Sequence, residues 1–338
     1  MKNKKGWIST GILMLTLTGM VLLGFQIRKS SGTGSGDYRE YKKHYALIAG
    51  TGDDEFWDKV YESAREEGEK KDIYVERFGN HLAIQYSRND LLKLAVQAQV
   101  DGIIVPGDED KETLTLIDEA VSSGIPVVTV LNDSTGSTRQ CFVGNNNYNL
   151  GQDYGRQIEK SIRAKGIDSQ ENPVKVLVLM DKDRLDTSQN LILLGIRETL
   201  DQRLGEEYPV QVETALVDNT GEFSSEDSIR DIFLDNEKLP DIMVCLSEIH
   251  TRCAFQAAVD YNKVGIVEIL GYYDSKTILE AVSKDIVSAT IAPDTDQMGR
   301  FCVQALEEYQ ETGYTNGYMA VETYLITPKE AGKLLESM

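Results

Sequence analysis

The sequence contains few of the residues that enzymes use for nucleophilic, redox or metal chemistry. Its 338 residues include three histidines and four cysteines, and the cysteines lie far apart without a C-x-x-C pair, which argues against a zinc or redox motif. No G-x-S-x-G segment is present, so a hydrolytic triad has no support. Residues 50–54 (GTGDD) lack the third glycine of G-x-G-x-x-G and place two carboxylates where a pyrophosphate would bind. We therefore predict that the protein is not an enzyme and uses no cofactor.

Two patterns could still hold a metal ion. His250 and Cys253 lie three residues apart on a predicted helix. No third metal-binding residue follows at a suitable spacing, so we expect a surface histidine beside a packed cysteine. Asp181, Asp183 and Asp186 crowd one predicted loop, but the segment lacks the sixth-position glycine and twelfth-position glutamate of a calcium loop. Calcium stays an alternative, and we predict no metal site. We expect the cysteines to be buried free thiols because they lie in or beside apolar runs.

Basic residues are scarce outside the amino end. The chain has 35 Lys and Arg residues against 55 Asp and Glu residues, and its net charge is −20. Because residues 1–43 carry +6, the remaining 295 residues carry −26. A body this acidic repels phosphate backbones, so a nucleic-acid partner is not expected.

The amino end has the pattern of a membrane segment. Residues 7–27 contain no charge over 21 positions, which is enough for a helix to cross the roughly 30 Å hydrocarbon layer. The lysines before this segment favour a cytoplasmic amino end. A cleaved signal peptide is the alternative, but no alanine before Ala46 could form an Ala-x-Ala-like cleavage site. We predict a cytoplasmic start and single transmembrane anchor over residues 1–29, a flexible tether over 30–43, and a body on the extracytoplasmic side of the cell membrane.

From residue 44 onward, short apolar runs alternate with segments of helical period. The runs expected to form strands are 45–50, 73–78, 102–106, 125–130, 141–144, 174–180, 210–217, 242–246 and 266–270. The segments expected to form helices are 55–71, 89–99, 113–123, 148–163, 188–203, 225–236, 251–262 and 275–284. This alternation predicts an α/β fold with two doubly wound parallel-sheet lobes. Because ligands of such sheets bind beyond the carboxyl ends of the strands, we expect the site in the loops that follow them.

Five segments of the body carry a family pattern in the right order and spacing. They are residues 45–68, 100–107, 124–133, 143–155 and 269–299. Together they make the chain, over about residues 44–328, resemble the periplasmic sugar-binding protein family, in particular its ribose-binding type I members that serve ABC transporters. The resemblance implies a ligand closed between two lobes that three crossovers join, near residues 143–147, 290–294 and 321–324. The implied N-terminal lobe comprises residues 44–144 plus 294–320, and the implied C-terminal lobe comprises 145–293 plus 321–338.

The resemblance also implies ligand-binding residues in the first loop. The positions that match are Asp54, Phe56 and Trp57, and the family places aromatic residues there to stack on the sugar. A pyranose presents an apolar C–H face that aromatic rings cover, and hydroxyls that carboxylates or amides bind. The alternative is that Phe56, Trp57 and Val60 form the core face of a helix.

The remaining site positions depart from the ribose-binding pattern. Asn132 and Asp133 stand where ribose binders have an Asp-Arg pair, although both residues also suit a turn. An expected Arg is Asn190, an expected Asn is Ser247, and the Asp of a Gly-Phe-Asp turn is Tyr273. The next residue, Asp274, is a second candidate for ligand contact and also suits a helix N-cap, whereas an expected Gln is Pro293. The predicted site therefore keeps polar residues in the expected loops, but they are not the residues with which ribose-binding members of the family bind ribose.

Two functions follow from these features. The first is a solute-binding receptor, for a sugar or similar small polar ligand, that delivers its ligand to an ABC transporter permease. The second is a membrane-tethered sensor whose lobe closure signals to a membrane kinase. A transcription regulator with the same ligand-binding fold would need a helix-turn-helix before residue 44, where this sequence has its apolar segment.

Overall fold

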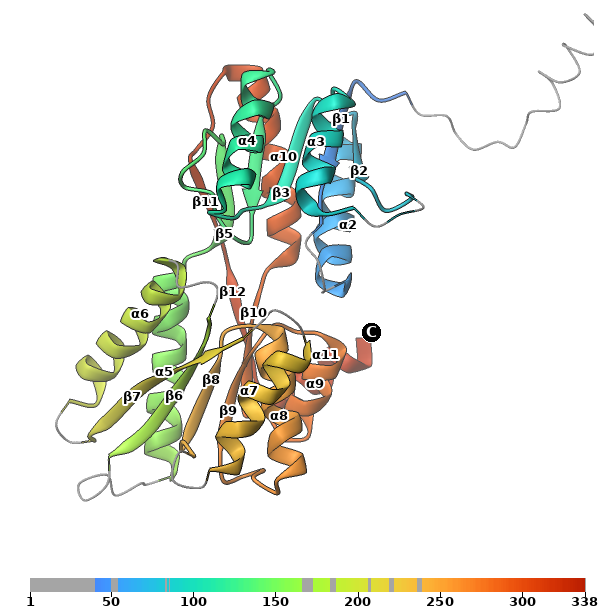
Figure 1. The fold of residues 1–338 in the computed structure, drawn as a ribbon. Coiled ribbons are helices and arrows are strands. Elements are labelled where there is room, and N and C mark those ends of the chain that lie inside the picture. The colour runs from blue at the N-terminus through green and yellow to red at the C-terminus, as the bar shows by residue number, and fades with distance from the viewer. Residues whose placement is uncertain are drawn as a thin grey trace, which may run out of the picture. The chain divides into compact units, whose positions relative to one another are not determined.

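The computed structural model describes residues 40–49, 54–82, 84, 86–165, 173–182, 187–205, 208–218, 222–235 and 239–337 (Figure 1). The predicted membrane segment over residues 7–27 lies outside this part of the chain. Within the described residues, no helix has the length and apolar character needed to cross a bilayer. Residues 43–338 form a unit separate from residues 1–42, and the described residues of this unit form two six-stranded sheets.

The first sheet has the strand order β11-β5-β4-β3-β1-β2, and all its strands run parallel. Its strands are β1 (Lys43–Leu47), β2 (Ile73–Arg77), β3 (Gly102–Pro106), β4 (Val127–Val130), β5 (Cys141–Asn145) and β11 (Tyr318–Val321). The helices associated with it are α2 (Asp54–Lys70), α3 (Arg88–Gln97), α4 (Lys111–Ser122) and α10 (Thr295–Thr312). Helix α3 packs on α4, and α10 packs on α2, β4 and β5. Every residue of β3 and β4 is buried, as expected for a parallel sheet covered on both faces.

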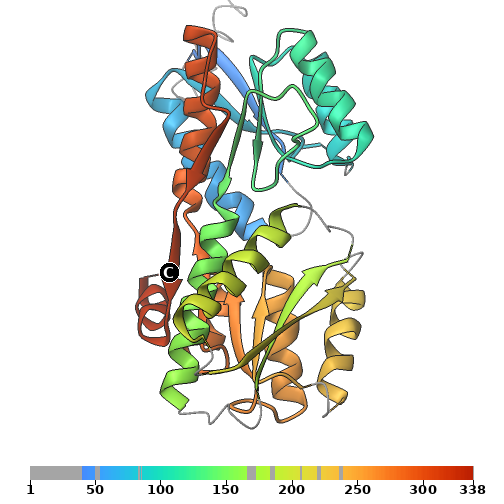
Figure 2. The ribbon, with the colours of Figure 1, turned by 90° about the vertical axis from the view of Figure 1, so that its left-hand side faces the viewer.

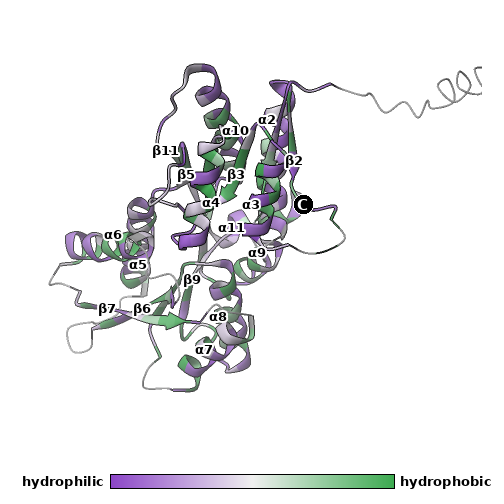
Figure 3. Cartoon of the chain, turned by 45° about the horizontal axis from the view of Figure 1, so that its top comes forward, coloured by the Kyte–Doolittle hydropathy of each residue, from purple (hydrophilic) through white to green (hydrophobic). Residues whose placement is uncertain are grey.

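The second sheet has the order β12-β10-β9-β8-β6-β7. Its strands are β6 (Val174–Asp181), β7 (Val210–Val217), β8 (Ile242–Cys245), β9 (Glu268–Tyr272), β10 (Ala289–Pro293) and β12 (Thr323–Ile326). Its helices are α5 (Asn147–Lys165), α6 (Thr187–Arg203), α7 (Glu222–Leu234), α8 (Glu248–Asp260), α9 (Lys276–Ser283) and α11 (Pro328–Ser337). Strand β12 is antiparallel to β10, whereas the other pairs are parallel. In Figure 3, β3 of the first sheet and β6 of the second are largely hydrophobic.

The chain passes between the two sheets at three places. It leaves the first sheet from β5 into α5, returns from β10 into α10, and passes from β11 directly into β12. Only Glu322 separates β11 from β12, and Figure 2 shows this last passage as the red strand at the left. These passages bring the carboxyl ends of β5 and β10 to the region between the sheets.

Glycines let helices α5 and α6 approach closely. A Cβ atom on Gly151 would lie 2.1 Å from the carbonyl oxygen of Ile192, and a Cβ atom on Gly195 would lie 2.3 Å from the carbonyl oxygen of Tyr148. No real Cβ contact is that short, so these positions require glycine unless the helices move apart. The close crossing fixes how α6 covers the second sheet, and α6 carries the candidate residue Asn190.

Candidate functional site

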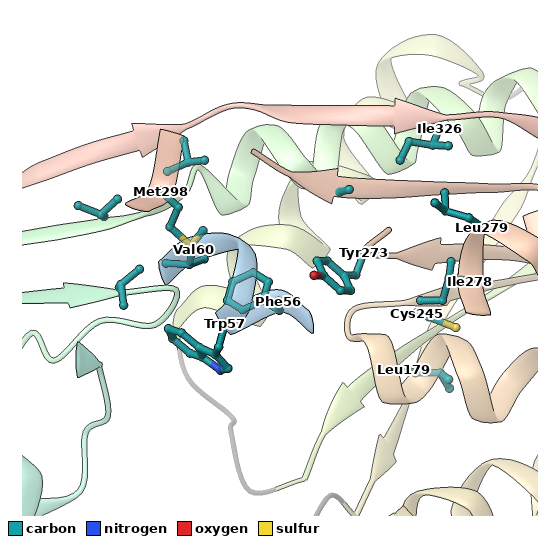
Figure 4. Close-up of a cluster of buried hydrophobic side chains, with 14 of the residues drawn as sticks. Phe56, Trp57, Val60, Leu179, Cys245, Tyr273, Ile278, Leu279, Met298 and Ile326 are labelled. Carbon is teal, nitrogen blue, oxygen red and sulfur yellow. The ribbon is translucent and has the colours of Figure 1, made fainter. Parts of the chain in front are cut away.

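Aromatic residues from both sheets meet beyond the carboxyl ends of the strands. Phe56 and Trp57 lie in the first turn of α2, and Tyr273 directly follows β9. The Phe56 ring centroid is 5.1 Å from that of Trp57 and 5.4 Å from that of Tyr273, both in edge-to-face arrangements. Figure 4 shows Phe56 between the other two rings. All three side chains are 4% exposed or less, so the ring of Phe56 directly contacts the part of the chain that belongs to the second sheet.

Tyr273 has an unusual backbone conformation. Its φ is +80°, in the left-handed region that bulky residues seldom adopt. The neighbouring strand β10 holds it there, because the Tyr273 N–H donates to Ile291 O at 2.9 Å and the Thr290 hydroxyl donates to Tyr273 O at 2.7 Å. Leu131 follows β4 with a φ of +67°. Sparsely populated conformations of this kind often occur at ligand sites, and here they redirect the chain where two central strands end.

An ion pair lies beside the rings. Lys59 Nζ, on α2, is 3.3 Å from Asp274 Oδ1 and 3.3 Å from Glu55 Oε1. The same ammonium lies 5.5 Å from the centroid of the Tyr273 ring. The Lys59 and Asp274 side chains are 29% and 27% exposed, so solvent screens their attraction only in part. Sequence reasoning missed Lys59, since its partner is 215 residues away.

A second polar contact joins the sheets at the first passage. Asn145, the last residue of β5, donates from Nδ2 to the hydroxyl of Tyr272, the last residue of β9, at 2.8 Å. Burial raises the pKa of Tyr272 to about 12; the hydrogen bond from Asn145 opposes this rise, whereas the charge of Asp274 adds to it. Tyr272 and Asp274 are two residues apart in the chain, so the Asn145–Tyr272 and Lys59–Asp274 pairs involve the same short segment. Neither Asn145 nor Tyr272 was among the predicted site residues.

The residues after β4 mostly bind their own loop. Asp133 accepts from Arg139 Nε at 2.5 Å and from Arg139 Nη2 at 2.6 Å. It also accepts from the Thr129 hydroxyl at 2.9 Å and from Ser134 N–H at 2.7 Å. The Asn132 carbonyl accepts from Gly107 N–H at 2.9 Å. These contacts agree with the turn alternative for this segment, and they fix the shape of the loop.

The other predicted residues have varied surroundings. Ser247 is the N-cap of α8 and accepts from His250 N–H at 3.2 Å. Asn190 is exposed near the start of α6. The N-cap of α9 is Ser275, so the alternative of Asp274 as the capping residue is wrong. Helix α2 begins at Asp54, whose side chain lies outside the described part of the structure.

His250 is a correction to the sequence-based expectation. It is fully buried instead of lying on the surface, and its Nε2 is 3.1 Å from Asp181 Oδ1 at the end of β6. The first turn of α8 faces the sheet, which places this histidine inside with Cys253. The four cysteines are buried and free, as predicted. Asp183 and Asp186 lie outside the described residues, within which no cluster of three His, Cys, Asp or Glu side chains could hold a metal.

Comparison with known proteins agrees with this geometry. Residues 45–313 match the model of the periplasmic binding protein domain. Among solved structures, GanP, a glucose-galactose binding protein from Geobacillus stearothermophilus, is 21% identical with a TM-score of 0.69, covering 85% of this chain and 98% of its own. AraP, an arabinose binding protein from the same organism, is 19% identical with a TM-score of 0.71 and coverages of 86% and 98%.

A third similar structure is a XylFII–LytSN complex, 22% identical with a TM-score of 0.66, which covers 86% of this chain and 99% of its own. Among curated protein sequences, none matches this one. The family match spans most of the chain, and the solved structures share the arrangement of two α/β lobes. The chain therefore belongs to the family of periplasmic binding protein domains.

Proposed function

We propose that this protein is an extracytoplasmic receptor that binds a sugar or similar small polar solute between its lobes and delivers it to an ABC transporter. One observation carries the proposal: the Phe56–Tyr273 ring contact is flanked by the Lys59–Asp274 and Asn145–Tyr272 pairs. Aromatic rings can cover the C–H face of a sugar, and the flanking amide, carboxylate and ammonium groups can bind its hydroxyls.

The proposed site combines residues from both sheets. Its first-lobe side is formed by Asp54, Phe56 and Trp57, with Asn132 and Asp133 in the loop after β4. Its second-lobe side is formed by Asn190, Ser247, Tyr273 and Asp274. Similar proteins support a sugar ligand, because they include a glucose-galactose binding protein, an arabinose binding protein and a solute binding protein with bound D-allose. The lobes would comprise residues 44–144 plus 294–320 and residues 145–293 plus 321–338, a division that sheet membership supports.

The receptor is proposed to remain attached to the cell membrane through residues 7–27. The uncharged 21-residue segment and the preceding lysines support this attachment. The tether that follows would keep the binding domain close to a transporter or another membrane partner.

A ligand screen tests the function. Purified full-length protein is heated with a panel of monosaccharides, and a sugar present at 100 times its Kd should add about 2.7 kcal/mol of stability. Calorimetry then measures affinity, and mass spectrometry checks that the bound sugar is returned unchanged. A panel without any stabilising sugar would contradict the proposed ligand class, and turnover of a bound sugar would overturn the proposal of a receptor without enzyme activity.

Signalling to a membrane kinase is a second candidate function. The observation in its favour is that a protein of this fold, XylFII, was solved in complex with a second protein, LytSN. Co-purification from membranes separates the two functions: a transporter permease is expected for the first and a kinase for the second.

A further inference from the structure

Asn145 has an amide group that is only half satisfied. The residue is 8% exposed, and its Nδ2 is held by the Tyr272 hydroxyl at 2.8 Å. Its Oδ1 is buried and accepts no hydrogen bond from any described residue. Native proteins rarely bury a carbonyl oxygen without a donor, because the group loses its hydration and gains nothing in return.

The position of this amide connects it to the candidate site. Asn145 ends β5 at the first passage between the sheets, and its partner Tyr272 ends β9. The two residues after Tyr272 are Tyr273, whose ring contacts Phe56, and Asp274, which pairs with Lys59. The unused oxygen therefore belongs to a residue of the first sheet that is hydrogen-bonded to the second sheet at Tyr272, the residue directly before Tyr273.

We propose that Asn145 is a specificity-determining residue whose Oδ1 accepts a hydrogen bond from one hydroxyl of the bound solute. This inference rests on the proposed function and deepens it, because it requires a solute with an O–H donor at one defined position. A solute without that hydroxyl would leave the oxygen unpaired in the complex, and sites built around a buried polar group reject such analogues strongly.

The test uses the monosaccharide that binds most tightly in the panel, together with its complete set of monodeoxy analogues. Calorimetry on full-length protein compares wild type, Asn145→Ala, and the control Asn149→Ala, which removes an exposed asparagine from the following helix. Wild type and the control are expected to bind one deoxy analogue about 10- to 100-fold more weakly than the parent sugar, equal to about 1.4 to 2.8 kcal/mol. Asn145→Ala should bind the parent sugar and that one deoxy analogue equally well, while its discrimination against the other analogues stays as in wild type.

Asn145→Asp provides the matched rescue, because it keeps an acceptor oxygen and can receive the Tyr272 hydroxyl proton. Asn145→Asp should still bind the parent sugar more tightly than that deoxy analogue. If the alanine variant does not fold, the test uses Asn145→Asp in its place. Equal weakening of the parent sugar and all analogues by Asn145→Ala would show a structural role only and overturn the inference. Unchanged binding would show that water satisfies Oδ1 and would also overturn it. If no sugar binds wild type, the proposed function fails, and this inference fails with it.

Discussion

Trp57 combines core packing with a place beside the proposed ligand. Its side chain is 3% exposed and contacts Phe56, which in turn contacts Tyr273. We expect Trp57→Ala to lower the free energy of unfolding by about 3–5 kcal/mol, because the change leaves a cavity. Chemical denaturation of ligand-free protein measures this loss, and Trp57→Phe, which keeps a ring, should lose less. A Trp57→Ala variant as stable as wild type would show that the indole is not a core residue.

Buried tyrosines predict a limit to stability at alkaline pH. Burial raises the pKa of Tyr272 to about 12, and burial also raises the pKa of fully buried Tyr154. The folded-state pKa of Tyr272 lies above the unfolded value of about 10, so the fold favours the protonated phenol. Its contribution to the free energy of unfolding is therefore fully present below pH 10 and is lost as the pH rises through 12. We expect phenolate absorbance at 295 nm to show a late fraction of tyrosines that ionise together with loss of the circular dichroism signal. Complete ionisation of a still-folded protein near pH 10 would contradict this assignment.

At the scale of elements, the Lys59–Asp274 pair connects α2 to the loop after β9. An ion pair that is about one-quarter exposed contributes on the order of 1 kcal/mol. Lys59→Met or Asp274→Asn should therefore lower the ratio of molecules with α2 in contact with the loop after β9 to molecules without this contact about fivefold. Labels on cysteines introduced at exposed Thr115 and Gln256 can report the inter-lobe distance, because the native cysteines are buried. The conservative change Lys59→Arg serves as the control, because it keeps the positive charge beside both Asp274 and Glu55, and it should retain the wild-type distance. Identical distances in all variants would show that the pair does not influence the lobes.

The crossing of α5 and α6 gives a separate prediction with an internal control. Gly151→Ala forces a methyl group against the carbonyl oxygen of Ile192 and should destabilise the protein by about 1–3 kcal/mol. Gly332→Ala, in α11, has open space around it, so higher helix propensity should stabilise the protein by about 0.4–1 kcal/mol. Thermal unfolding of both variants measures the difference. Equal melting temperatures would show that α5 and α6 can separate without cost.

Most elements could be predicted from sequence, because strands and helices have different apolar periods. Strands β3 and β7 have the predicted bounds, whereas α7 and α8 begin three residues before the predicted positions. Each of these two first turns holds a single apolar residue among polar ones, Phe223 in α7 and Ile249 in α8, so the apolar period does not mark the start of the helix. The elements after α9, namely β10, α10, β11, β12 and α11, had no separate prediction from periodicity. Strands β11 and β12 are only four residues long and pair with β5 and β10, so a local pattern says little about them.

The site was only partly predictable for a related reason. Apolar periodicity and the order of elements identify the loops after the strands, and the family resemblance selects Phe56 and Tyr273 within those loops. The roles of Lys59 and Asn145 depend on contacts with Asp274 and Tyr272 across the fold, which no local pattern encodes. His250 illustrates the same limit, because its burial depends on which face of α8 turns toward β6.

At the scale of the whole molecule, the amino-terminal segment predicts a defined orientation. Protease added to intact cells should degrade the body and leave a protected amino-terminal fragment, since residues 7–27 are expected to cross the membrane. Mass spectrometry of the remaining fragment checks the result. A mature protein that starts near residue 30 would instead show that the segment is a removed signal peptide.

The direct passage from β11 to β12 also influences when the protein can fold. Strand β11 completes the edge of the first sheet beside β5, yet the whole second sheet except β12 is encoded between these two strands. During synthesis, the amino-terminal sheet therefore keeps an open edge beside β5 until β11 has left the ribosome, and such distant pairings form slowly. For the proposed receptor outside the cytoplasm, this delay would help export, because a chain that has not closed its first sheet can still be threaded through a translocation pore.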